Sequence, residues 1–113
     1  MMDFNLNKEK ELHGIVIFEM KEDGCLNGLW TNNQEKGEVY NEIAKKFSGD
    51  KNCFTGLYSD SWIQEDEIVN GKLRVSEENG IYTLEWIYEE NKPHYKGSGF
   101  KFGNLLVATY WQV

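Results

Sequence analysis

Aromatic side chains are the residues of this sequence best suited to binding chemistry. Six Tyr, six Phe and four Trp make up 14% of its 113 residues. Ring faces with phenol and indole hydrogen-bonding tips are typical of pockets that take a small apolar or aromatic molecule. We expect four of these residues to line a ligand pocket, namely Trp30, Tyr58, Trp86 and Tyr95. The alternative is that the rings fill the interior of the protein and leave no space for a ligand.

Residues that could carry catalysis do not form a recognisable set. His13 and His94 have no carboxylate or nucleophile at a diagnostic spacing. Cys25 and Cys53 lie outside any Cys-x-x-Cys motif, so we expect two free buried thiols rather than a zinc site or a disulfide. Glu85 interrupts an apolar stretch, and the alternation there predicts that it points outward; an inward orientation would make it a catalytic candidate. We therefore expect no enzyme, no metal site and no cofactor.

The charge balance argues against two classes of partner. The chain contains 12 basic and 19 acidic residues, which gives a net charge of −7, and no basic run is longer than Lys45-Lys46. Nucleic acids and anionic membrane surfaces attract clusters of Lys and Arg, so we expect neither partner. The first residues contain no basic segment followed by an apolar run, and even an apolar run as long as any in the chain, 15–18, is too short to span a bilayer. These features predict a cytoplasmic protein.

Regularly spaced turn signals indicate the elements that must position these side chains. Asp23-Gly24, Asn79-Gly80 and Gly103-Asn104 place glycine or asparagine where hairpin turns need a positive φ. Between such turns apolar residues alternate with polar ones, as expected of half-buried strands. The clearest such row is Tyr82, Leu84, Trp86 and Tyr88. The segment from Leu105 to Val113 is instead apolar on both faces, which is typical of a strand covered on both sides.

A weak internal repeat indicates that these strands close into a barrel. Residues 25–30 and 53–58 both contain a Cys, an apolar residue, a polar residue, Gly, Leu and an aromatic residue, in that order. Glycine inside a strand lets it coil sharply and lets a bulky aromatic ring lie over the backbone. We therefore predict one domain, residues 1–113, folded as an antiparallel up-and-down β-barrel of about eight strands.

One segment predicts a departure from the all-strand pattern. The apolar residues between Gly37 and Phe47 follow helical spacing, and Glu42 with Lys46 adds a possible i, i+4 ion pair. We expect a short helix over Gly37 to Phe47 that plugs a barrel end or covers an exposed strand. A strand is the alternative, because three periods do not settle so short a stretch.

The segment Gly28-Leu29-Trp30 resembles the Gly-x-Trp motif in the first strand of lipocalins. Extended to Asn32, it is similar to the opening strand of avidins, and residues 54–58 are similar to a later avidin strand. The chain also resembles an uncharacterised bacterial family with a Leu-x-Trp strand and a Tyr-x-Gly-x-Gly hairpin. The resemblance implies a calycin-like barrel whose ligand contacts include Asn32 and Tyr58.

Two functions from different classes follow. The first is a non-catalytic barrel that binds a small apolar or aromatic ligand through Trp30, Asn32, Tyr58, Trp86 and Tyr95. The second is a structural or protein-interaction barrel with a filled core, which self-associates as a homodimer through a surface such as Leu105 to Val113. A cavity between the aromatic residues would favour the first, and a packed interior with an apolar outer patch would favour the second.

Overall fold

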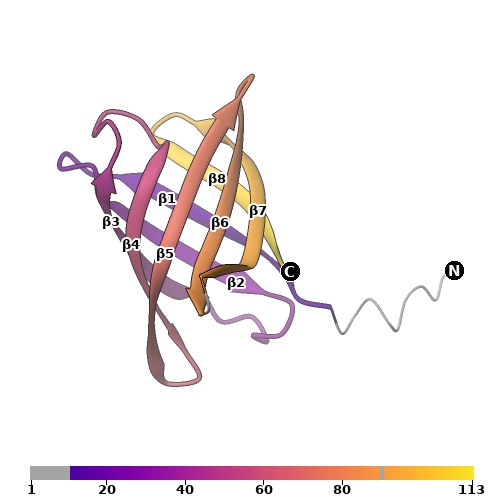
Figure 1. Cartoon of the computed structure of the whole chain (residues 1–113). Coiled ribbons are helices and arrows are strands. Elements are labelled where there is room, and N and C mark those ends of the chain that lie inside the picture. The colour runs from indigo at the N-terminus through magenta and orange to yellow at the C-terminus, as the bar shows by residue number, and fades with distance from the viewer. Residues whose placement is uncertain (1–10, 90) are drawn as a thin grey trace, which may run out of the picture.

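A computed structural model describes residues 11–89 and 91–113, which form a closed antiparallel β-barrel (Figure 1). Eight strands follow one another around the barrel in sequence order. They are β1 (His13–Met20), β2 (Leu26–Asn32), β3 (Tyr40–Ser48), β4 (Gly56–Gln64), β5 (Glu67–Glu78), β6 (Ile81–Glu89), β7 (Lys92–Phe102) and β8 (Leu105–Gln112). The prediction of an all-β, up-and-down barrel is therefore confirmed.

The barrel closes where the first strand pairs with the last. In this antiparallel pair Val16 of β1 lies opposite Ala108 of β8, and the register is regular from His13 to Glu19. On its other side β1 pairs with β2, where Val16 lies opposite Trp30. Because each strand has two neighbours, the sheet has no unpaired edge of the kind that recruits another chain.

Hairpin turns form at the predicted positions. Asn79 and Gly80 join β5 to β6 with φ values of 53° and 85°, the left-handed conformation that a two-residue turn of this type requires. The turns at Asp23-Gly24 and Gly103-Asn104 likewise lie between consecutive strands. Local sequence thus determines these connections.

The predicted helix over Gly37 to Phe47 is wrong, and most of that segment is strand β3. Among the described residues no helix is present, and hence none is long and apolar enough to cross a membrane. Pairing with both β2 and β4 overrides the helical spacing: Glu42 and Ala44 point inward, whereas Ile43 is exposed. Lys46 does not pair with Glu42 but donates hydrogen bonds to the carbonyl oxygens of the following loop.

The two ends of the barrel are filled differently. The connections after β1, β3, β5 and β7 lie at one end, and those after β2, β4 and β6 at the other (Figure 1). At the first end the loop after β3 inserts Phe54, which is 2% exposed, and the Tyr58 hydroxyl donates a 2.6 Å hydrogen bond to the Phe54 carbonyl. We call this the closed end. The opposite end, which contains the cavity described below, is called the open end.

Glycines make room for aromatic rings on the inner wall. A Cβ atom on Gly28 of β2 would lie 2.7 Å from the Phe18 ring, and one on Gly97 of β7 would lie 3.2 Å from the Trp86 ring. The rings therefore lie directly on the backbone, as the repeated glycines predicted.

Candidate ligand-binding pocket at the open end

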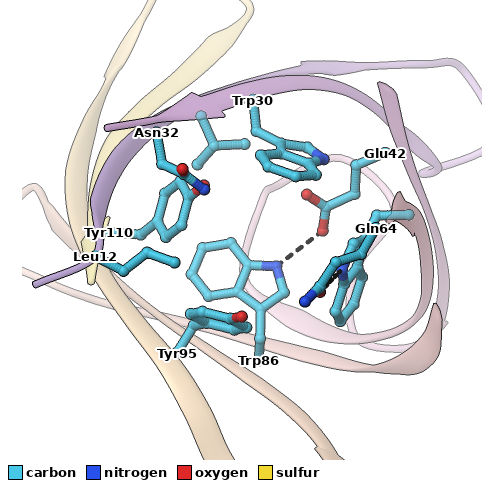
Figure 2. A pocket seen from close by; sticks show the side chains of 10 residues that line it. Leu12, Trp30, Asn32, Glu42, Gln64, Trp86, Tyr95 and Tyr110 are labelled. Atoms are coloured by element: carbon cyan, nitrogen blue, oxygen red, sulfur yellow. Dashed lines mark hydrogen bonds between the residues drawn. The ribbon is translucent and has the colours of Figure 1, made fainter. Parts of the chain in front are cut away.

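A cavity of about 50 Å³ lies inside the open end of the barrel (Figure 2). Its walls come from strands β1, β2, β3, β4, β6, β7 and β8, so it is shaped by the whole barrel rather than by one loop. The lining residues are Leu12, Val16, Trp30, Asn32, Glu42, Trp62, Gln64, Trp86, Tyr95 and Tyr110.

Aromatic rings form much of the wall. The Trp86 and Tyr110 rings have centroids 5.7 Å apart, and Tyr95 meets Tyr110 edge-on at 6.1 Å. Trp30, across the cavity in Figure 2, packs on Tyr40 with 4.9 Å between ring centroids. Burial raises the pKa of Tyr110 to about 12 and also raises that of Tyr95. Both phenols are therefore neutral at physiological pH, and their rings and hydroxyls face the cavity as uncharged groups.

A single carboxyl group faces this aromatic wall. Glu42 is 4% exposed, and the Trp86 indole Nε1 donates a 2.8 Å hydrogen bond to its Oε2 (Figure 2). Glu42 points inward because alternation along β3 places it on the same face as Ala44. Burial raises the pKa of Glu42, since removal from water disfavours the charged form.

A second carboxyl group lies directly behind the first. Asp60 of β4 is 1% exposed and sits opposite Ala44, one strand away from Glu42 on the same inner face. No donor group pairs with either oxygen of the Asp60 side chain. Burial, and then the charge of Glu42, raises the pKa of Asp60 well above its usual value. Two negative charges held close together away from water repel each other, so the raised pKa values favour a pair that retains a proton.

Within residues 11–89 and 91–113, no ion pair joins a basic side chain to Glu42 or Asp60. Lys21 pairs with Glu19, and Arg74 and Lys96 pair with Glu85, all at the surface. A third protein ligand for a metal ion is also missing, since within the same residues no group of three His, Cys, Asp or Glu side chains is close enough to hold one. Among the described residues, the carboxyl pair thus has no cationic partner.

One indole at the cavity also lacks a partner. Trp30 is 8% exposed, and its Nε1 donor is buried without a hydrogen-bond acceptor. Two other polar side chains at the cavity are engaged: Asn32 donates a 3.0 Å hydrogen bond to the Tyr110 hydroxyl, and Gln64 accepts one of 3.2 Å from Trp62. A buried donor without an acceptor costs free energy, and only an acceptor atom, of water or of another molecule, can satisfy this N–H.

Four of the five predicted ligand residues lie together around this cavity, and one does not. Trp30, Asn32, Trp86 and Tyr95 all line it. Tyr58 lies at the closed end, where its hydroxyl donates a hydrogen bond to the Phe54 carbonyl. Phe54, which the preceding loop inserts into the barrel and which we call the plug, fills that half of the interior.

Sequence reasoning missed the carboxyl pair. Glu42 was not recognised as an inward-pointing residue, because the predicted helix over Gly37 to Phe47 placed it in an ion pair with Lys46. Asp60 carried a usable signal, since it lies midway between Tyr58 and Trp62 and alternation places all three on one face. An acidic residue in an otherwise aromatic inner row is therefore the feature that could have located this site.

The remaining candidates for chemistry lie away from the cavity. Glu85 points outward, as the alternation predicted, and pairs with Arg74 at 2.8 Å. Cys25 and Cys53 are free, but both are half-buried rather than fully buried. The His94 ring packs at a tilt on Tyr88 with 4.3 Å between ring centroids, and His13 lies exposed at the start of β1.

Comparison with known proteins gives no assignment: no family model, curated protein or solved structure matches this chain. The class of protein is thus defined by the fold and the cavity alone, as a closed eight-stranded barrel with an aromatic, acidic pocket at one end.

Proposed function

We propose that the barrel is a non-catalytic module that binds a small molecule in the pocket at its open end. The observation that carries the proposal is a cavity of about 50 Å³ among aromatic rings, with the buried Glu42 carboxyl in its wall. Preformed concave sites with aromatic walls and a few polar groups are typical of small-molecule binding. The likeness of Gly28-Leu29-Trp30 to the lipocalin motif supports the same proposal, as does the placement of four of the five predicted residues around the cavity.

The size of the cavity limits what it takes. Pockets that enclose a drug-sized ligand measure roughly 300–1,000 Å³, and an engineered cavity of roughly 150 Å³ holds one benzene ring. A space of about 50 Å³ therefore encloses only a head group of a few heavy atoms, and the rest of a longer ligand extends out of the open end.

The indole N–H signals of the four tryptophans provide a direct test. Trp30, Trp62 and Trp86 line the pocket, whereas Trp111 is 41% exposed and does not line it. In ¹⁵N-labelled protein titrated with a panel of small neutral, cationic and anionic fragments, we expect the pocket indoles to shift and saturate while Trp111 stays unchanged. If no fragment moves the pocket indoles, or if Trp111 moves equally, the proposal fails.

Self-association is the second candidate, and a particular surface favours it. On the outside of the barrel Phe100, Val107, Ile17 and Leu29 lie opposite one another in register across four neighbouring strands. Leu29 and Phe100 are 52% and 55% exposed, and contiguous apolar surface of this kind is typical of interaction sites. Light scattering over a range of concentrations tests this candidate: we expect a dimer that Leu29→Lys converts to a monomer, and a monomer at all concentrations would exclude it.

The cytoplasmic location remains a prediction.

A further inference from the structure

We propose that the head group bound in this pocket is a small organic cation, an ammonium group, held by Glu42 and by the surrounding aromatic rings. This inference rests on the proposed function and specifies its ligand class. Three features carry it: a buried acidic pair that forms no ion pair within the described residues, an aromatic wall, and too few further ligands in those residues for a metal ion.

The first feature concerns charge. Buried carboxyl groups are normally paired with a cation, bound to a metal or protonated, because an isolated buried charge is costly. Glu42 and Asp60 are both at least 96% removed from solvent, and none of the described ion pairs includes them. A cation that enters the cavity meets Glu42 first, since Glu42 lines the cavity and Asp60 lies behind it. An anionic head group would meet the same carboxyl and be repelled.

The second feature is the aromatic wall. A cation near the face of Trp or Tyr is attracted by the ring quadrupole, most strongly where water is excluded. Trp30, Trp86, Tyr95 and Tyr110 line the cavity, and Figure 2 shows the Glu42 carboxyl beside Trp30 and Trp86. Aromatic rings and a carboxylate in the same wall both favour positive charge.

The third feature separates an ammonium group from a metal ion. The described residues offer only two carboxyl groups at this place and no third His, Cys, Asp or Glu ligand, whereas most protein-bound divalent ions take more ligands from hard oxygen or nitrogen donors. Indole and phenol rings do not supply the missing ligands. They do pack against the methylene groups next to an ammonium nitrogen, so the set of groups fits an amine.

The test uses three probes of equal chain length and different charge: n-butylammonium, n-butanol and n-butyrate. An alkylammonium has a pKa near that of lysine, about 10.4, so it is fully charged at neutral pH. Titrated into ¹⁵N-labelled protein, butylammonium should shift the Trp30 and Trp86 indole signals and bind at least about tenfold more tightly than butanol. Butyrate should not bind.

A matched pair of variants locates the charge. Glu42→Gln keeps an oxygen that accepts the Trp86 hydrogen bond but removes the charge, and we expect it to weaken butylammonium binding about tenfold. Glu85→Gln makes the same chemical change on the outer face of β6, next to Trp86 in the chain, and should leave binding unchanged. Where Glu42→Gln does not fold, the comparison of the three probes on the unaltered protein decides the question.

The outcomes distinguish this inference from the function on which it rests. If butanol or butyrate shifts the pocket indoles as strongly as butylammonium, the pocket binds small molecules but the preference for a cation is wrong. If butylammonium does not bind while other fragments do, the inference likewise fails and the proposed function stands. If no fragment of any charge moves the indole signals, both fail.

Discussion

The two ends of this barrel use similar residues in opposite ways. Each end contains a buried aromatic residue with a polar tip, Tyr58 at the closed end and Trp30 at the open end. The Tyr58 hydroxyl donates to the Phe54 carbonyl, so the chain satisfies its own hydrogen-bonding group and seals that end. The Trp30 Nε1 has no acceptor and lies at a cavity beside a carboxyl group.

This contrast shows that an inward-pointing aromatic ring does not by itself indicate a binding site. What distinguishes the ends is the loop that reaches each of them. The loop after β3 turns Phe54 into the interior, whereas the residues that line the cavity at the open end lie in strands, apart from Leu12 just before β1. The closed end should therefore contribute mostly stability, and the open end should tolerate change with little loss of stability.

Removal of the plug should have the largest effect. Phe54→Ala deletes a ring that is 98% buried, and we expect the free energy of unfolding to fall by about 3–5 kcal/mol. Urea denaturation measures the loss, and the Trp30 and Trp86 indole signals of the folded variant should stay in place. A loss below about 1 kcal/mol would mean that the closed end does not carry the stability assigned to it.

A smaller effect is expected when only the polar tip at the closed end is removed. Tyr58→Phe keeps the ring but leaves the Phe54 carbonyl without its buried donor. We expect the free energy of unfolding to fall by about 1–2 kcal/mol, again measured in urea. An unchanged value would show that water reaches this carbonyl and that the end is not sealed.

The carboxyl pair should appear as a pH dependence of stability. The pKa values of Glu42 and Asp60 are raised in the folded protein, so their contribution is complete below the ordinary carboxyl pKa of about 4 and is lost as pH rises through the raised values. Asp60→Asn removes one titrating group while keeping a hydrogen-bond donor beside Glu42. We expect thermal unfolding to depend less on pH between mildly acidic and mildly alkaline buffers than in the unaltered protein; an equal dependence would contradict the assignment.

The smallest effect is expected at the open end. Trp30→Phe removes an N–H that has no acceptor, and the ring it shortens borders the cavity. We expect the free energy of unfolding to change by about 1 kcal/mol or less. Trp30→Phe is the counterpart of Tyr58→Phe at the other end. If Trp30→Phe lowered the free energy of unfolding more than Tyr58→Phe does, the comparison between the two ends would be reversed.

Local signals in the sequence were enough to predict the barrel but not its pocket. Asn79-Gly80 and its counterparts specify hairpins through backbone conformation alone, and consecutive hairpins lead to an antiparallel barrel. The inner position of Glu42 depends instead on pairing with Gly28 in β2 and Trp62 in β4. Contacts of this kind override a helical spacing of apolar residues, which is why the strand was predicted as a helix.

The inward position of Phe54, the plug, could not be predicted from the sequence for a related reason. Phe54 belongs to a loop, where strand periodicity gives no information about direction. Tyr58 was therefore assigned to the ligand pocket together with Trp30, although the two lie in different halves of the barrel. The aromatic residues could be predicted to point inward, but not which of them border empty space.

The seam between β1 and β8 has a consequence for how the molecule is made. Seven of the eight strand pairings join neighbours in sequence, and each can form soon after its second strand leaves the ribosome. The pairing of β1 with β8 joins residues almost a hundred positions apart, and contacts between such distant residues form slowly. Until β8 arrives, β1 and β7 both present open strand edges, so a nascent or truncated chain is exposed to aggregation that the finished barrel avoids.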